Sequence, residues 1–407
     1  MEDANDTRRD GSVARSATVT QCVVLLEGWG ARQGSLTEGA RAPLLSCGDR
    51  PFLAWLLREF VRFGVTDFLL LCEPPSTRIE AAVDTIAAYL PRAARITIAP
   101  TPVGAGTGGA VFHARARLDD RFVLCHGDRF FDFNLADLLS SAAGDEDGVV
   151  GRIALRPRRE LPSLSDVAMD GDTTSGTVSS GVGLFRRSVI DRIAPRCSME
   201  IEVMPRLAAA RVLRGTRSCG YFCDFNVPED SARAQEDLPR LLHRRALFLD
   251  RDGVLNVDRG HVGTRERFEW IPGARDALRY ATQKGWHVFV VTNQSGIARG
   301  YYDEAAVRGL LDWAADEARR SGGTIDDVRY CPFHEDAVVE AYRRPSDWRK
   351  PAPGMVLDLI RAWELDPKNC LMVGDQLTDV ASAAAAGVQG HLFGGGNLLT
   401  FVRGLLG

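Results

Sequence analysis

Residues 247–255 read Leu-Phe-Leu-Asp-Arg-Asp-Gly-Val-Leu. A short apolar run that is followed at once by carboxylates and a glycine is typical of a buried strand ending at a polar site. In open sheets of parallel strands, ligands bind beyond the carboxyl ends of the strands. Asp250 and Asp252 are therefore the first candidates for a catalytic site, and their partners are expected at the ends of other apolar runs.

Three further segments in the same half of the chain carry side chains suited to phosphate chemistry. Thr292 ends one apolar run, Asp375 and Asp379 follow another, and Lys350 stands just before a predicted helix. Because the carboxyl ends of parallel strands meet at one edge of a sheet, we expect these side chains to gather there. Four elements in this order favour a site over a set of unrelated surface turns.

The residue types indicate a phosphatase with Asp250 as its nucleophile. A covalent step divides one difficult displacement into two easier ones. A cation must relieve the repulsion between carboxylate and phosphate, and carboxylate oxygens suit Mg²⁺. Asp252 is predicted to protonate the leaving oxygen and then to activate water, while Thr292 and Lys350 orient the phosphoryl group. The predicted magnesium ligands are Asp250, Asp252, Asp375 and Asp379.

Composition places the chain among ordinary globular proteins. It has 407 residues, 45% hydrophobic residues and a formal net charge of −4, which suits two domains. Nothing indicates a nucleic-acid partner, and no apolar run reaches the roughly 18 residues of a membrane span. The nine scattered cysteines favour reduced thiols. The sequence therefore predicts a cytoplasmic protein without nucleic-acid or membrane partners.

Apolar β-rich runs alternate with helical patterns along the whole chain, which predicts two doubly wound α/β domains with mostly parallel sheets. The expected strands are 22–26, 68–72, 122–126, 246–249, 287–291 and 370–373. The expected helices are 51–63, 78–90, 274–284, 304–320 and 353–363. A charged segment, 228–245, separates the two series. We therefore predict a disordered tail over 1–18, a first domain over 19–240 and a second over 241–407.

The motifs of the second domain resemble the haloacid dehalogenase superfamily and, within it, the D,D-heptose 1,7-bisphosphate 7-phosphatases. The likeness covers nearly all of 245–395 and rests on the segments 250–262, 292–300, 330–332, 349–355 and 374–379. It implies a site closed by loops rather than by a large cap domain. It also implies Mg²⁺ as cofactor and the C7 phosphate of a heptose 1,7-bisphosphate as the group removed.

The same resemblance implies which residues meet the substrate. An arginine suits the second anion of a bisphosphate, because a guanidinium binds phosphate through two hydrogen bonds. Histidinol-phosphate phosphatases are close relatives, so another small phosphorylated sugar or polyol is the alternative substrate. The residues expected at the sugar and the distal phosphate are Asn293, Gln294, Ser295, Gly296, Arg299 and Arg349.

One departure from this family concerns zinc. Members often carry Cys-x-His followed by Cys-x-Cys directly before Arg-Lys-Pro, whereas the matching positions here are Cys331, Phe333, Ser346 and Trp348, with His334 shifted by one. Since tetrahedral zinc needs four ligands, we predict that this protein binds no zinc. The hypothesis that follows is that Phe333 and Trp348 pack together and hold the loop instead.

Residues 20–235 resemble the sugar-1-phosphate nucleotidyltransferases. The resemblance rests on the order of landmarks, from the glycine-containing loop 26–32 through 104–109, 126–128 and 179–185 to 222–230. It implies a Rossmann-like domain in which Gly28, Gly30 and Arg32 bind the phosphates of a nucleoside triphosphate. It also implies that Asp128 and Asp224 hold Mg²⁺ between nucleotide and sugar phosphate.

Two departures weaken that catalytic interpretation. Glu27 stands where the family has glycine, and Ala42 stands where it has lysine, although Arg41 is adjacent. Losing an interaction with a charged group costs about 1.5–3 kcal/mol. The sequence leaves two interpretations open: an active nucleotidyltransferase that uses a nucleoside triphosphate, or a non-catalytic binding module attached to a phosphatase.

Overall fold

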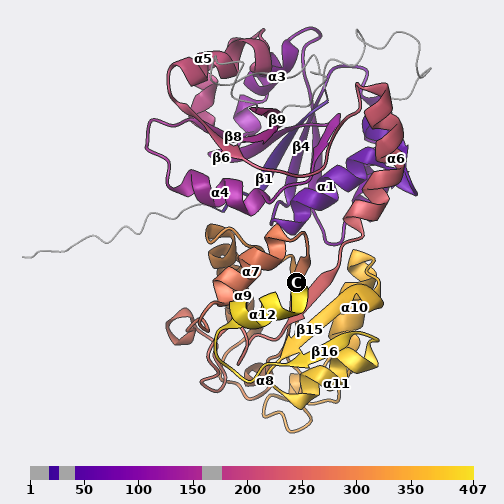
Figure 1. The fold of residues 1–407 in the computed structure, drawn as a ribbon, viewed down its shortest axis with the longest axis vertical. Helices are drawn as coiled ribbons and strands as arrows, with labels where there is room; N and C mark the ends of the chain where they lie inside the picture. The colour runs from indigo at the N-terminus through magenta and orange to yellow at the C-terminus, as the bar shows by residue number, and fades with distance from the viewer. Residues whose placement is uncertain (1–17, 27–41, 158–176) are drawn as a thin grey trace, which may run out of the picture.

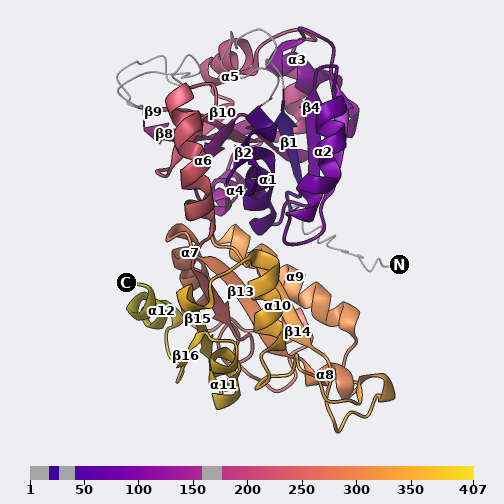
Figure 2. The same cartoon turned by 90° about the vertical axis from the view of Figure 1, so that its right-hand side faces the viewer.

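The computed structural model of the protein describes residues 18–26, 42–157 and 177–407. Nearly all of the predicted tail lies outside this part, as do Gly28, Gly30 and Arg32. The described chain forms two α/β bodies, one from each half of the sequence (Figure 1). Helix α6 (Pro228–Leu242) packs on the first body, and the chain then enters the second (Figure 2).

A seven-stranded sheet forms the centre of the N-terminal half. In spatial order its strands are β10 (Leu213–Arg217), β8 (Gly151–Pro157), β9 (Thr177–Arg186), β6 (Arg121–His126), β1 (Gln21–Leu25), β4 (Asp67–Cys72) and β5 (Arg95–Pro100). Strand β9 runs antiparallel to β6 and β8, and the other pairs are parallel. All five residues of β1 are buried, as expected for a strand covered on both faces.

Short antiparallel pairs and helices complete this half. The pairs are β2 (Ser46–Cys47) with β3 (Arg50–Pro51), and β7 (Arg129–Phe131) with β11 (Phe222–Asp224). The other helices are α1 (Phe52–Arg62), α2 (Thr77–Ala88), α3 (Gly106–His113), α4 (Leu135–Ala143) and α5 (Met204–Ala209). A π turn, Met199–Val203, precedes α5.

The C-terminal half contains a five-stranded, fully parallel sheet. In spatial order its strands are β14 (Asp327–Cys331), β13 (His287–Asn293), β12 (Ala246–Leu249), β15 (Cys370–Gly374) and β16 (Gln389–Leu392). The helices are α7 (Ala274–Gln283), α8 (Ser295–Ala298), α9 (Glu304–Arg320), α10 (Gly354–Trp363), α11 (Leu377–Ala385) and α12 (Leu398–Leu406). The two sheets with their helices confirm the predicted α/β class.

Helix α1 joins the two halves. All eleven of its residues are buried, charged ones included. Arg62 Nε lies 3.1 Å from Asp326 Oδ2, and Arg58 Nη1 lies 3.1 Å from Glu364 Oε2. Trp55 on α1 belongs to the same buried apolar cluster as Trp363 on α10. The two halves therefore share one continuous core.

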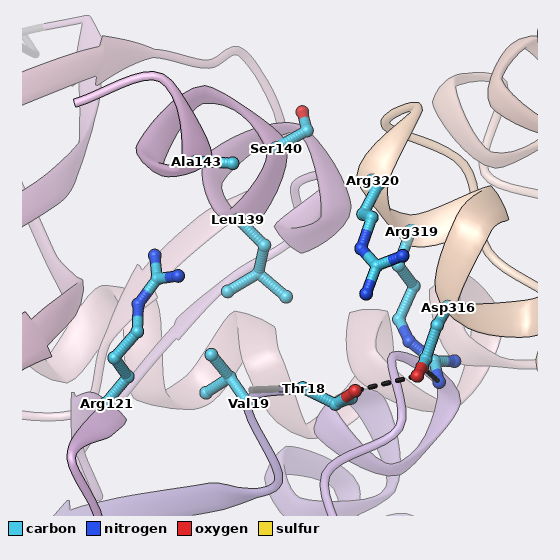
Figure 3. A pocket seen from close by; sticks show the side chains of 9 residues that line it. All are labelled: Thr18, Val19, Arg121, Leu139, Ser140, Ala143, Asp316, Arg319 and Arg320. Carbon is cyan, nitrogen blue, oxygen red and sulfur yellow. Dashed lines mark hydrogen bonds and ion pairs between the residues drawn. The ribbon is translucent and has the colours of Figure 1, made fainter. Parts of the chain in front are cut away.

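A pocket of about 50 Å³ opens beside this junction, between α4 and α9 (Figure 3). Leu139 and Val19 form its apolar wall, and Thr18 donates a 2.7 Å hydrogen bond to Asp316 Oδ2 at its edge. No residue predicted to act in catalysis or binding lines this pocket. Among the helices of the described chain, none is both long and apolar enough to cross a membrane.

Candidate active site

Three carboxylates meet at the carboxyl edge of the C-terminal sheet. Asp250 follows β12, Asp375 follows the neighbouring β15, and Asp379 lies in the first turn of α11. One oxygen of each lies within 4.8 Å of the others. Within residues 18–26, 42–157 and 177–407, this is the one group of three such side chains close enough to share an ion.

Glycine is required where the chain turns past Asp252. Gly253 has a φ of +83°, a conformation that side chains disfavour, and a Cβ there would collide with the carboxylate of Asp375. The turn therefore brings the loop after β12 directly against the loop after β15. The close approach explains why the motif has glycine directly after its second carboxylate.

Lys350 supplies the positive charge of the site. Its Nζ lies 2.8 Å from Asp250 Oδ1 and 2.6 Å from Asp379 Oδ1, and it donates a 3.0 Å hydrogen bond to the Val291 carbonyl. Asn293 exchanges two hydrogen bonds of 3.1 Å with the Lys350 backbone. Burial lowers the pKa of the Lys350 ammonium, but the two carboxylates outweigh burial and hold that pKa above its ordinary value.

The donor set fits a divalent cation. Burial raises the pKa of Asp250 to about 7, and the nearby Asp379 charge adds to this while Lys350 opposes it. Burial also raises the pKa of Asp375, whose carboxylate accepts a 2.9 Å hydrogen bond from the Gln376 amide. Three carboxylates beside one ammonium leave excess negative charge, and oxygen ligands of this kind suit Mg²⁺. Asp250, Asp375 and Asp379 are the residues that would hold it.

Asp252 lies outside this group of three, although the sequence predicted it as both a catalytic residue and a metal ligand. Its carboxylate accepts hydrogen bonds of 2.7–3.1 Å from Arg251, of 3.0 Å from Asn256 and of 3.1 Å from Gln294. These donors fix its orientation beside the three carboxylates. Sequence reasoning missed the positioning role of Arg251 and Asn256, for which the only signal was their place inside the motif.

Thr292 and Gln294 form a buried pair at the end of β13. The Gln294 amide donates a 2.9 Å hydrogen bond to Thr292 Oγ1, and its carbonyl accepts one of 3.0 Å from the Tyr302 hydroxyl. Gln294 is 1% exposed. Its side chain was predicted to meet substrate but lies against protein groups here, and no sequence signal identified Tyr302.

The remaining predicted substrate residues lie at the helix after β13 and just before Lys350, and they differ in exposure. Ser295 and Gly296 begin α8, Arg299 directly follows it and is exposed, and Arg349 is half-buried. Burial and the charge of Arg299 both lower the pKa of the Arg349 guanidinium.

A hollow of about 310 Å³ lies in the loops that follow Asp252. Its lining includes His261, Arg267 and Tyr301. The loop is tied to the site because Arg251 Nη2 donates a 2.7 Å hydrogen bond to the Val262 carbonyl.

Of the four loop positions that match zinc ligands in related proteins, only Cys331 has a side chain that binds zinc. Cys331 ends β14 and is buried, and burial raises its thiol pKa. The imidazole of His334 is engaged within its own loop, since its Nδ1 accepts a 3.0 Å hydrogen bond from the Asp336 backbone. Phe333 and Trp348 both pack against the large core cluster, which is consistent with an apolar role for them.

In the N-terminal half, Asp128 and Asp224 also come together. The Asn226 amide nitrogen lies 2.7 Å from Asp128 Oδ2 and 2.9 Å from Asp224 Oδ1. Arg129 lies against both carboxylates. Ala42 begins a 3₁₀ turn, Ala42–Leu44, while the glycine loop predicted to bind nucleotide lies outside the described residues.

Comparisons with known proteins agree with this geometry in the C-terminal half. The model of the haloacid dehalogenase-like hydrolase family matches residues 232–387. The D-glycero-beta-D-manno-heptose-1,7-bisphosphate 7-phosphatase of Rhodopseudomonas palustris is 47% identical over 163 residues, which are 40% of this chain and 91% of that protein.

Solved structures resemble each half separately. The D,D-heptose 1.7-bisphosphate phosphatase from B. bronchiseptica, complexed with magnesium and phosphate, is 34% identical and covers 39% of this chain and 86% of its own, with a TM-score of 0.35. HddC from Yersinia pseudotuberculosis is 20% identical and covers 54% of this chain and 99% of its own, with a TM-score of 0.45.

Proposed function

The chain belongs, through its C-terminal half, to the haloacid dehalogenase-like phosphatases related to heptose-bisphosphate 7-phosphatases, and from this premise we propose that it hydrolyses the C7 phosphate of D-glycero-D-manno-heptose 1,7-bisphosphate. The observation that carries the proposal is the group of Asp250, Asp375 and Asp379 closed by Lys350. A relative that matches over 91% of its own length at 47% identity supports the substrate.

The proposed reaction proceeds in two displacements at phosphorus. An Asp250 carboxylate oxygen attacks the C7 phosphoryl group, and the bond from phosphorus to the sugar oxygen breaks. Asp252 gives its proton to that oxygen, so the heptose leaves as an alcohol. Asp252 then takes a proton from water, which attacks the aspartyl phosphate and releases phosphate and free Asp250.

The other residues of the site orient and neutralise the groups in transfer. Lys350 compensates the charge of Asp250 and of the phosphoryl oxygens, and the Thr292 hydroxyl offers a further donor. Mg²⁺, when bound, supplies positive charge that the single ammonium cannot provide. Arg299 and Arg349 are proposed to bind the C1 phosphate, since a guanidinium suits a second phosphate group.

Phosphate release from a panel of sugar phosphates, followed by ³¹P NMR of the products, tests this function. We expect the 1,7-bisphosphate to lose only its C7 phosphate, with activity that requires Mg²⁺. Asp250→Asn should reduce kcat by about 10³-fold or more, because the nucleophile is lost. Asp276→Asn, an exposed carboxylate on α7, is the matched control and should keep full activity.

Two results would contradict the proposal. Full activity of Asp250→Asn would remove the nucleophile assignment, and preference for histidinol phosphate over every heptose phosphate would remove the substrate. We also propose that the protein carries no structural zinc, and metal analysis that finds one zinc per chain would overturn this.

A further inference from the structure

The paired carboxylates of the N-terminal half are not arranged like the cation site of the C-terminal half. Strand β7 pairs with β11 so that Arg129 stands directly opposite Asp224, and Asp128 immediately precedes Arg129. This register places Arg129 beside Asp224 across the strand pair. The contact is therefore built into the strand pairing and does not depend on a flexible loop.

The two carboxylates share two neighbours, the amide of Asn226 and the guanidinium of Arg129. The Asn226 side-chain amide donates one hydrogen bond to each carboxylate, to Asp128 Oδ2 at 2.7 Å and to Asp224 Oδ1 at 2.9 Å. Arg129 Nε faces the other two oxygens, Asp224 Oδ2 at 3.3 Å and Asp128 Oδ1 at 3.8 Å. The Arg129 contacts are ion pairs rather than hydrogen bonds, and Asp128 Oδ1 is buried without a hydrogen-bond partner among the described residues. The guanidinium thus places a positive charge beside both carboxylates.

The position of Arg129 is enclosed. Its side chain is 11% exposed, and those of Asp128 and Asp224 are 11% and 3% exposed. Gly181 makes room for it, because a Cβ at that residue would lie 3.3 Å from Arg129 Nη1. A guanidinium does not lose its proton in proteins. A divalent cation entering here would meet a permanent, buried positive charge.

Glu200, whose partner His126 also lies near Asp128, has hydrogen-bond donors of its own. Glu200 accepts hydrogen bonds from Thr107 at 2.6 Å, from Ser198 at 2.9 Å and from His126 Nε2 at 2.8 Å. The C-terminal site differs in charge, because three carboxylates there share the one ammonium of Lys350, whereas Asp128 and Asp224 share the guanidinium of Arg129. The residues present at Asp128 and Asp224 therefore do not fit Mg²⁺.

We infer that Arg129 takes the place of the divalent cation in the N-terminal half, so that Asp128 and Asp224 hold no Mg²⁺ and this half performs no metal-dependent nucleotidyl transfer. The inference is independent of the reaction proposed for the C-terminal half. It selects the non-catalytic interpretation from the two that the sequence left open, and it names the residue responsible.

Counting bound Mn²⁺ on the full chain by equilibrium dialysis tests the inference. The wild type should bind one ion per chain, and Asp375→Asn should bind none. Arg129→Met, which keeps the length of the side chain but not its charge, should gain a second ion. Arg129→Lys should stay at one, and Arg129→Met combined with Asp128→Asn should return to one. Near-UV circular dichroism checks the fold of each variant.

Three results would overturn the inference. The first is a wild type that binds two ions and loses one in Asp128→Asn, a measurement that needs no arginine variant. The second is a folded Arg129→Met variant that gains no ion. The third is Mg²⁺-dependent pyrophosphate release from heptose 1-phosphate and a nucleoside triphosphate that Asp128→Asn abolishes. Loss of phosphatase activity in Asp250→Asn bears only on the other half, so the two proposals fail separately.

Discussion

Gln294 shows how a single buried amide can align a catalytic group. It bridges Asp252 and Thr292 while its carbonyl accepts from Tyr302. We expect Gln294→Leu to lower kcat by about 10–100-fold and to leave KM within about twofold, because the amide orients Asp252 rather than binding the sugar. Steady-state kinetics with the proposed bisphosphate measures both constants.

Tyr302→Phe is the matched control for this prediction. It removes one hydrogen bond to Gln294 and leaves both contacts from the Gln294 amide in place, so kcat should fall by less than in Gln294→Leu. A large rise in KM with unchanged kcat in Gln294→Leu would instead support direct contact with substrate, as the sequence predicted.

Glu200 gives a pH-dependent prediction. Burial alone raises the pKa of its carboxyl. The charge of His126, its hydrogen bond and a further hydrogen bond from Thr107 outweigh burial and hold that pKa well below the ordinary value. Below pH of about 4.3 the unfolded state therefore binds more protons than the folded state, so the stability that Glu200 contributes is present above this pH and is lost as pH falls.

Glu200→Gln should accordingly lower the free energy of unfolding by about 1–3 kcal/mol at pH 7, and this deficit should shrink below pH of about 4.3. Urea titrations from pH of about 7 to about 3.5 span this range and measure the difference between the two proteins. A deficit that stays constant across it would show that the charge of Glu200 is not what stabilises the fold.

The candidate site was predictable from sequence where a residue directly follows a strand. Asp250, Thr292 and Asp375 end or follow apolar runs, and parallel pairing then brings them together. Arg251 and Tyr302 could not be found this way. Their contacts depend on the path of loops and on side-chain direction, which hydrophobic periodicity does not encode.

At the scale of the element, the turn between β12 and the loop after it depends on Gly253. Gly253→Ala should destabilise the protein by about 1–2 kcal/mol from its positive φ alone, and the collision with Asp375 should also lower kcat. Gly309→Ala is the control, because this exposed residue of α9 has no atom within 4 Å of an added Cβ.

The control substitution, Gly309→Ala, should raise the free energy of unfolding by about 0.5–1 kcal/mol, since alanine is more stable than glycine in a helix interior. Thermal unfolding and kinetics on both variants separate the local turn from a general effect of an added methyl group. Equal activity of Gly253→Ala and the wild type would argue against the required close approach of the two loops.

Strands and helices were mostly predictable because their patterns are local. The helix expected over 304–320 is α9 with the same bounds, and the strand expected over 122–126 is β6 within one residue. The antiparallel direction of β9 was not predictable, since all but its two end residues are buried and the strand lacks the solvent-facing polar side that marks many antiparallel strands. Direction is set by the connection, which is a property of the whole sheet.

At the scale of the molecule, α1 differs most from what a sequence pattern suggests. Arg58, Glu59 and Arg62 have the composition of a solvent face, yet all three are buried. They are buried because the C-terminal half covers them, with Asp326 and Glu364 as partners. A helix of the N-terminal half that pairs with Asp326 and Glu364 ties the stability of the C-terminal half to its own, which gives the N-terminal half a structural role.

Arg62→Met tests this coupling. The change leaves Asp326, which is 0% exposed in its side chain, without its arginine, and breaking a buried pair in this way costs about 3–5 kcal/mol. We therefore expect a large loss in the free energy of unfolding, with phosphatase activity lost in the same urea transition.

Arg279→Ala is the control, because its pair with Asp137 also joins the two halves but is half exposed and should contribute less than about 1 kcal/mol. Two separate urea transitions in the wild type, with activity following only the second, would show that the halves are stable independently.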